Sequence, residues 1–78
     1  MDKNEFNKLF GQYLKNRRVL KGWSQTDLAA ILGNNSQNIS RIERGELTPT
    51  IYWFQKLANA FECCPSEFLK DFEDSISK

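Results

Sequence analysis

Apolar residues recur every three to four positions along most of the chain, which is the spacing of one face of an α-helix. No segment alternates apolar and polar residues for long, so no strand is expected. Four helices are predicted from about Asn4 to Lys21, Gln25 to Leu32, Ser36 to Arg44 and Thr50 to Phe61. A fifth helix is expected from Pro65, because proline suits the first helical position. The apolar stripe of this fifth helix comprises Phe68, Leu69, Phe72 and Ile76.

Local capping residues mark the ends of these helices. Gly22 and Gly33 follow the first two helices as left-handed C-terminal stops. Ser24 can cap the second helix, and Asp27 can complete a capping box with it. Asn35 is the expected N-cap of the third helix. The sequence therefore predicts an all-α fold of five helices, in which a short glycine turn joins the second and third.

The length of 78 residues suits one small domain over 1–78 and is too short for two. No apolar run reaches the about 20 residues that cross a bilayer, and the N-terminus does not resemble a secretory signal. We therefore expect a cytoplasmic protein without membrane contact. The chain has no histidine, and adjacent Cys63 and Cys64 cannot complete a zinc site. No metal, cofactor or small-molecule ligand is expected.

Charge is unevenly distributed although the net charge is only +1. Residues 1–45 carry eight Lys and Arg against four acids, whereas residues 46–78 carry three against six. One end of the molecule can therefore face a polyanion while the other does not.

The third predicted helix has a narrow apolar side and a polar outer side. Only Ile39 and Ile42 face inward, while Ser36, Gln37 and Arg41 lie near one outward face. Glutamine can pair with adenine through two hydrogen bonds, and arginine can pair in the same way with guanine. Two short helices joined by a glycine turn can place the second one in a DNA major groove. These three polar residues are therefore the predicted base contacts.

Many residues in fixed order resemble the lambda-repressor-like, or XRE-type, helix-turn-helix family. The resemblance covers about residues 8–69 and implies five helices, with the second and third forming the DNA-binding pair. The residues that carry it are Gly11, Leu14, Arg18, Gly22, Trp23, Ser24, Gln25, Leu28, Ala29, Gly33, Pro49 and the run from Ile39 to Gly45.

The resemblance also implies roles for individual residues. Gln25 matches a glutamine that binds a phosphate and braces the recognition helix, and Ser36, Gln37 and Arg41 match base-reading positions. Arg18 and Glu43 match an ion pair between helices one and three, which we interpret as structural because burial of a charge is tolerated when it is paired. Phosphate contacts set register rather than sequence. The predicted backbone contacts are Gln25, Asn35, Asn38, Arg44, Lys15 and Thr48.

Three positions depart from the family pattern. Asn34 replaces an apolar residue, so it either loses a contact with Ile39 in a solvated turn or is free to meet a phosphate. Glu62 replaces a glycine after the fourth helix, although glutamate disfavours the left-handed conformation. Cys64 stands where Ser or Asp commonly caps the fifth helix, and a thiol is a poor acceptor.

Several apolar residues are candidates for a homodimer contact. The predicted inward residues of the fourth helix are Ile51, Phe54, Leu57, Ala58 and Phe61. Tyr52 and Trp53 lie outside this inward face. These two aromatics can pack against the fifth helix or the tail, form a dimer contact, or touch the DNA backbone. The last turns of the fifth helix are expected to face a partner. The dimer candidates are Trp53, Phe72 and Ile76.

Together these features predict a sequence-specific regulator that binds double-stranded DNA as a homodimer. Its two recognition helices would enter successive major grooves about 34 Å apart on a near-palindromic operator. Such a stand-alone regulator fits a restriction–modification controller, a phage or mobile-element repressor, or an antitoxin, and the resemblance does not choose among them. The alternative is a protein-interaction adaptor that keeps the fold without base readout. An enzyme is not expected, because histidine, a Gly-rich phosphate loop and a plausible acid pair are all lacking.

Overall fold

The computed structural model describes residues 1–77, which form five α-helices and no strand. The predicted all-α fold of five helices is confirmed, and each helix end that the sequence predicts lies within one residue of the observed end. The helices are α1 (Lys3–Leu20), α2 (Gln25–Leu32), α3 (Ser36–Glu43), α4 (Ile51–Ala60) and α5 (Pro65–Ile76).

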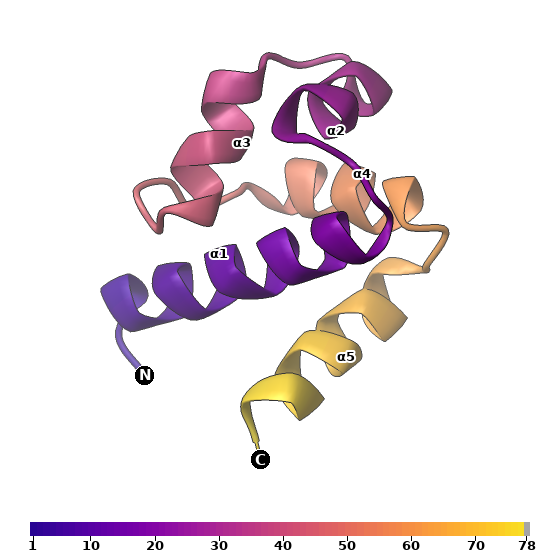
Figure 1. The fold of residues 1–78 in the computed structure, drawn as a ribbon. Coiled ribbons are helices and arrows are strands. Elements are labelled where there is room, and N and C mark those ends of the chain that lie inside the picture. Colours follow the sequence, from indigo (N-terminus) through magenta and orange to yellow (C-terminus); the bar gives the residue numbers. More distant parts are fainter. Residues whose placement is uncertain (78) are drawn as a thin grey trace.

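Helix α1 crosses the middle of the molecule, with α2 and α3 on one side of it and α5 on the other (Figure 1). It packs against α3 and α5, while α2 packs against α3 and α4. Helix α4 in turn packs against α5. The pair α2 and α3 is therefore supported from behind by α1 and α4, at the end of the molecule opposite α5.

The helix starts follow the capping chemistry that the sequence predicts. Ser24 and Asp27 form a complete capping box at α2, with bonds of 3.0 and 2.8 Å between each side chain and the other's backbone N–H. The Asn35 side chain accepts a bond from the backbone N–H of Asn38 and so caps α3. Gly33 ends α2 in the left-handed conformation, at φ 69°. These caps fix where the chain turns between α2 and α3.

An aromatic core joins α1, α4 and α5. Phe10 lies edge-on to both Phe68 and Phe72, at ring-centroid distances of 6.3 and 5.4 Å. The prediction that Phe72 faces a partner is wrong, because its side chain is only 1% exposed. The Phe72 ring lies edge-on to both Phe6 and Phe10 of α1, at ring-centroid distances of 5.5 and 5.4 Å. Ile76, one turn later, is half-buried against the same core.

The predicted apolar face of α4 is correct except at its first turn. Leu57, Ala58 and Phe61 are buried, and Phe54 is half-buried against them. The prediction that Ile51 points inward is wrong, because this side chain is 86% exposed. Ile51 instead borders an open groove at the start of α4.

Tyr52 and Trp53, the two aromatics outside the predicted inward face of α4, have different surroundings. Trp53 is half-buried and lines a cavity of about 220 Å³ together with Leu32, Ile39 and Leu47. It therefore packs on the side of α2 and α3 and not on α5. Tyr52 is 60% exposed, which leaves its predicted alternatives open.

The three departures from the family pattern have distinct local outcomes. The side-chain oxygen of Asn34 accepts bonds of 2.8 Å from the Asn35 backbone N–H and 3.0 Å from the Asn38 amide. Asn34 therefore organises the turn before α3, a role that the sequence analysis did not give it. Glu62 takes the left-handed conformation at φ 59° in place of glycine. Cys64 makes no side-chain cap bond at α5, and its thiol donates instead to the Glu67 carboxylate.

Candidate nucleic-acid interface

The outer face of α3 presents a stripe of polar side chains. Gln37, Ser40, Arg41 and Arg44 line one shallow hollow of about 280 Å³. Their spacing of three, four and seven residues from Gln37 places them on one side of a helix. Two of the predicted base contacts, Gln37 and Arg41, thus share this surface and are exposed. Ser36 lies half-buried at the first position of α3, outside the hollow.

Ser40 is a residue that the sequence analysis did not place in the site. It faces the same hollow as the two predicted base contacts. Its position, three residues after Gln37 and four before Arg44, is the signal that identifies it, because these intervals bring helical side chains together.

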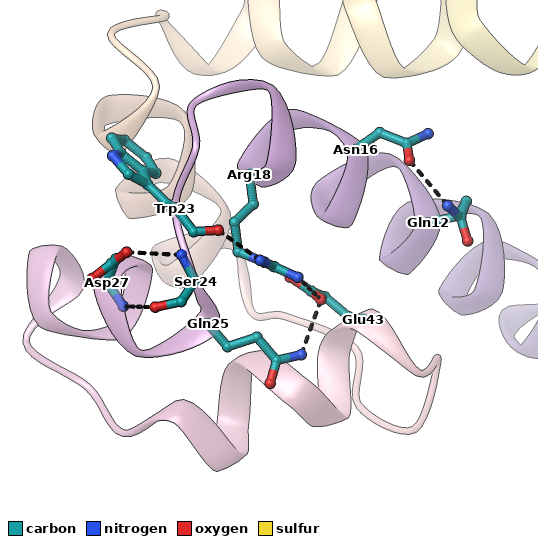
Figure 2. Close-up of polar contacts among 8 residues, drawn as sticks. All are labelled: Gln12, Asn16, Arg18, Trp23, Ser24, Gln25, Asp27 and Glu43. Carbon is teal, nitrogen blue, oxygen red and sulfur yellow. Dashed lines mark hydrogen bonds and ion pairs between the residues drawn. The ribbon is translucent and has the colours of Figure 1, made fainter.

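Behind α3, the predicted ion pair between Arg18 and Glu43 is present (Figure 2). The Arg18 guanidinium donates two bonds to the Glu43 carboxylate, of 2.7 and 3.0 Å, and a third of 2.7 Å to the Trp23 carbonyl. The two charged side chains are only 10% and 3% exposed. The hydrogen bond to Glu43 is the main reason that the pKa of Arg18 is raised. This bidentate pair ties the end of α3 to α1.

Gln25 extends this brace to α2. Its side-chain amide donates a bond of 3.1 Å to Glu43 Oε1, as Figure 2 shows. Glu43 therefore accepts bonds from α1 and from α2, and α3 is held in register by both. The bracing half of the role implied for Gln25 is thus present in the structure.

Gly11 allows α1 and α3 to approach closely. A Cβ atom at this position would lie 2.4 Å from the carbonyl oxygen of Ile42 and 2.6 Å from that of Glu43. Contacts this short do not occur for real side chains, so any other residue would push α3 away from α1. Only glycine therefore permits this position of α3.

A second arginine–glutamate pair lies at the front of α3. The Arg44 guanidinium donates bonds of 2.9 and 3.1 Å to the two carboxylate oxygens of Glu46, and a further bond to the Ser40 hydroxyl. These Arg44 and Glu46 side chains are 55% and 53% exposed. The bond from Arg44 is the main cause of the lowered pKa of Glu46, and the positive charge of Arg41 acts in the same direction.

The other predicted backbone contacts differ in how free their side chains are. Asn35 and Asn38 bond within the turn and first turn of α3. The Thr48 hydroxyl donates 2.8 Å to Asn7, a buried residue of α1. Lys15 is exposed on α1 and forms no ion pair with any part of the chain that the structure describes. Lys15 is thus the most available cation in the predicted set.

Most acids of the acidic half of the sequence lie away from this surface, whereas Glu46 lies at it. Helix α5 carries four of the six acids of residues 46–78 and lies across α1 from α3 (Figure 1). The charge asymmetry of the sequence thus becomes an asymmetry between two ends of the molecule. The acids on α5 are Glu67, Asp71, Glu73 and Asp74.

No group of three or more acidic or cysteine side chains in residues 1–77 is arranged to hold a metal ion. Within the same residues, no helix combines the length and apolar character needed to span a membrane.

Comparison with protein families identifies a helix-turn-helix family. The model of the helix-turn-helix family HTH_3 matches residues 14–69, from the middle of α1 into α5. A comparison with curated protein sequences gave no match.

Solved structures with the same arrangement of helices include two restriction–modification controller proteins. C.AhdI from Aeromonas hydrophila is 32% identical, with a TM-score of 0.79 over 87% of this chain and 99% of C.AhdI. A point mutant of C.Esp1396I is 26% identical, with a TM-score of 0.82 over 92% of this chain and 91% of the controller. An HTH_3 family transcriptional regulator from Vibrio cholerae is 31% identical, with a TM-score of 0.79 over 90% of this chain but 39% of the longer regulator.

Proposed function

Because the chain belongs to the helix-turn-helix family HTH_3, we propose that this DNA-binding transcriptional regulator acts as a homodimer on a near-palindromic operator. Helix α3 of each copy lies in a major groove, and the regulator acts in the cytoplasm, where it has access to its DNA. The observation that carries the proposal is the exposed polar stripe of α3, held from behind by a buried ion pair. The role is one of binding, with no reaction to catalyse.

In this proposal Gln37 and Arg41 contact base edges, and Ser36 contacts them from the first turn of α3. Side chains of these types on the outer face of a recognition helix are suited to such contacts. The residues around them bind backbone phosphates and so fix the register of α3 without reading sequence. These proposed phosphate contacts are Gln25, Asn35, Asn38, Arg44, Lys15 and Thr48.

The test starts with selection of bound duplexes from a random pool, which yields the half-site and its spacing. Arg41→Ala is then expected to weaken binding to the selected duplex by about 1–3 kcal/mol and to relax preference at one base pair. Lys15→Ala is the matched control. It removes one exposed cation and is expected to weaken selected and random duplexes alike, with a shallower salt dependence.

The outcomes separate base readout from general attraction. If Arg41→Ala weakens selected and random duplexes by the same factor, Arg41 does not read bases. If the pool yields no preferred sequence at all, the regulator proposal fails, and the adaptor alternative takes its place.

The surface for the second copy follows from the exposed apolar residues. A groove of about 310 Å³ at the start of α4 is lined by apolar side chains and one threonine, and none of its lining residues is charged: Phe6, Thr48, Pro49, Ile51, Phe54 and Leu69. Thr48 and Pro49 also border the cavity beside α3, so the groove adjoins the DNA-facing end.

Geometry favours a second copy as the occupant of this groove. The Cα atoms span 31 × 24 × 23 Å, so two recognition helices about 34 Å apart bring the copies close enough to touch directly. A two-fold contact places the exposed Ile51 of each copy against the groove of the other. An interface of about 800 Å² per copy would cover roughly a sixth of the 4984 Å² surface, which is one face of the molecule. Trp53 and Ile76 are half-buried and at most border it.

Sedimentation equilibrium tests this surface. Ile51→Glu and Leu69→Glu are expected to shift the mass from dimer to monomer, because each places a charge in the apolar contact. Ile31→Glu is the matched control: Ile31 is 51% exposed on α2, away from the groove. An unchanged dimer mass in both groove variants would exclude this surface.

Similarity over nearly all of C.AhdI favours the restriction–modification controller among the three types of regulator. A controller's operator is expected beside the genes of a restriction–modification system. Location of the selected duplex sequence in the source genome tests this assignment.

A further inference from the structure

Glu46 is an acidic residue beside Arg41 and Arg44, two arginines of the proposed DNA-binding surface. It follows Gly45 directly after α3, and its carboxylate binds the Arg44 guanidinium through both oxygens. Arg44 lines the polar hollow of α3 together with Arg41, whose charge also reaches Glu46. A carboxylate in this place opposes binding to a polyanion, so its presence calls for an explanation.

The geometry of the pair resembles that of a phosphate contact. Arginine binds carboxylates and phosphates alike through two parallel N–H···O bonds. In the free protein Glu46 therefore occupies the donors that Arg44 would present to a phosphate. Both side chains are about half exposed, so an incoming phosphate can reach the guanidinium from solvent.

We propose that Glu46 acts as an internal substitute for a DNA phosphate, which the operator must displace from Arg44. This inference rests on the proposed DNA-binding function and assigns to Glu46 a role that weakens binding. Every duplex, selected or random, has to break the same internal pair and approach the same carboxylate. Glu46 thus lowers the affinity for all DNA, so that occupancy of random sequence stays low and the base contacts decide where the regulator resides.

Glu46→Gln tests the proposal because it removes the charge and keeps the shape of the side chain. Affinity for selected and random duplexes is expected to rise by a similar factor, roughly three- to tenfold at low salt. The logarithm of the binding constant is expected to fall more steeply with the logarithm of salt concentration, by up to about 0.9 in slope, because one more counterion is released.

Glu73→Gln is the matched control, since it makes the same charge change at an exposed position of α5. It is expected to leave both affinity and salt slope close to those of the unmodified protein. A gain from Glu73→Gln equal to that from Glu46→Gln would show that only net charge matters, and would overturn the proposal. Weaker binding by Glu46→Gln would overturn it as well, because Glu46 would then position Arg44 for its phosphate.

A double-mutant cycle with Arg44→Gln supplies the specific evidence. Arg44→Gln is expected to weaken binding more in the Glu46→Gln protein than in the unmodified protein, because Arg44 is then free of its internal partner. Equal losses in the two backgrounds would contradict displacement. Failure of these tests leaves the selected duplex and the Arg41→Ala result intact, so it is distinguishable from failure of the proposed function.

Discussion

Two arginine–glutamate pairs flank the recognition helix, and they differ mainly in burial. Arg18 and Glu43 lie behind α3 with side chains 10% and 3% exposed, whereas Arg44 and Glu46 lie in front with side chains 55% and 53% exposed. Both pairs are bidentate, with bonds between 2.7 and 3.1 Å. The same chemistry therefore occurs in two solvent environments on two sides of one short helix.

Burial decides what each pair can do. Behind α3, water cannot replace a lost partner, so the charges depend on each other and fix the position of the helix. In front of α3, water and salt compete with the pair and make its net contribution small. An exposed pair can be exchanged for a ligand without disturbing the fold. The rear pair is thus suited to holding α3, and the front pair to responding to DNA.

The largest expected effect comes from breaking the rear pair. Glu43→Ala leaves the Arg18 guanidinium buried without its counter-charge and also removes the acceptor of Gln25. We expect a loss of about 3–5 kcal/mol in the free energy of unfolding, measured by urea denaturation. A domain of this size has a total of about 4–12 kcal/mol, so this variant is expected to be partly unfolded at 37 °C.

Glu43→Gln provides a graded companion that retains the shape of the side chain. Its amide oxygen can still accept a bond from Arg18, so a smaller loss is expected. If Glu43→Ala unfolds at the same urea concentration as the unmodified protein, the rear pair does not hold α3, and the contrast between the two pairs disappears.

A smaller effect is expected when both charges of the rear pair are removed together. In the double variant Arg18→Met and Glu43→Leu, no buried charge is left without a partner. Replacement of a buried pair by apolar residues is often neutral or stabilising, although here the Trp23 carbonyl and Gln25 lose partners. We expect stability within about 2 kcal/mol of the unmodified protein, measured by urea denaturation. A double variant as unstable as Glu43→Ala would show that the pair supplies more than compensation of charge.

The two pairs also differ in how visible they are in the sequence. Arg18 and Glu43 lie on different helices, and only the family resemblance links them. Arg44 and Glu46 are two residues apart, which is not a spacing that brings side chains together on a helix. They meet because the chain leaves α3 at Gly45, at φ 77°. Their contact is a property of the turn, which periodicity does not describe.

The helices themselves follow from the sequence almost completely, because caps and apolar spacing are local signals. The burial of each apolar face depends on how the helices pack, which is not a local property of the sequence. Phe72 and Ile51 both lie on predicted apolar stripes, yet one is 1% exposed and the other 86%. Packing against Phe6 and Phe10 of α1 buries Phe72, whereas Ile51 borders an open groove. The outer face of α3, Ser40 included, was predictable as a polar stripe from its helical spacing, whereas the hollow on it required the helix in place.

A loss of about 1 kcal/mol is expected for Gln25→Ala, because one hydrogen bond of 3.1 Å to Glu43 is lost. The Arg18–Glu43 pair remains, so the fold is retained and α3 loses only its link to α2. Thermal unfolding measures this loss, with Gln12→Ala as control, since the Gln12 side chain bonds to exposed Asn16 on the same helix (Figure 2). Equal effects of the two variants would mean that Gln25 does not brace α3.

The smallest expected effect on stability is that of Glu46→Ala at the front pair. Removal of this carboxylate leaves Arg44 exposed to water and still bonded to Ser40. Hydration replaces the lost ion pair, so the midpoint of urea unfolding is expected to stay unchanged within error. The same variant is expected to bind DNA more tightly, in the same direction as the effect expected of Glu46→Gln. The two pairs have different roles if Glu46→Ala changes DNA binding but not unfolding, while Glu43→Ala changes unfolding most. The Arg44–Glu46 pair would then respond to DNA, and the Arg18–Glu43 pair would hold α3. A clear fall in the unfolding midpoint of Glu46→Ala would instead show that both pairs hold α3, and that burial is not what distinguishes them.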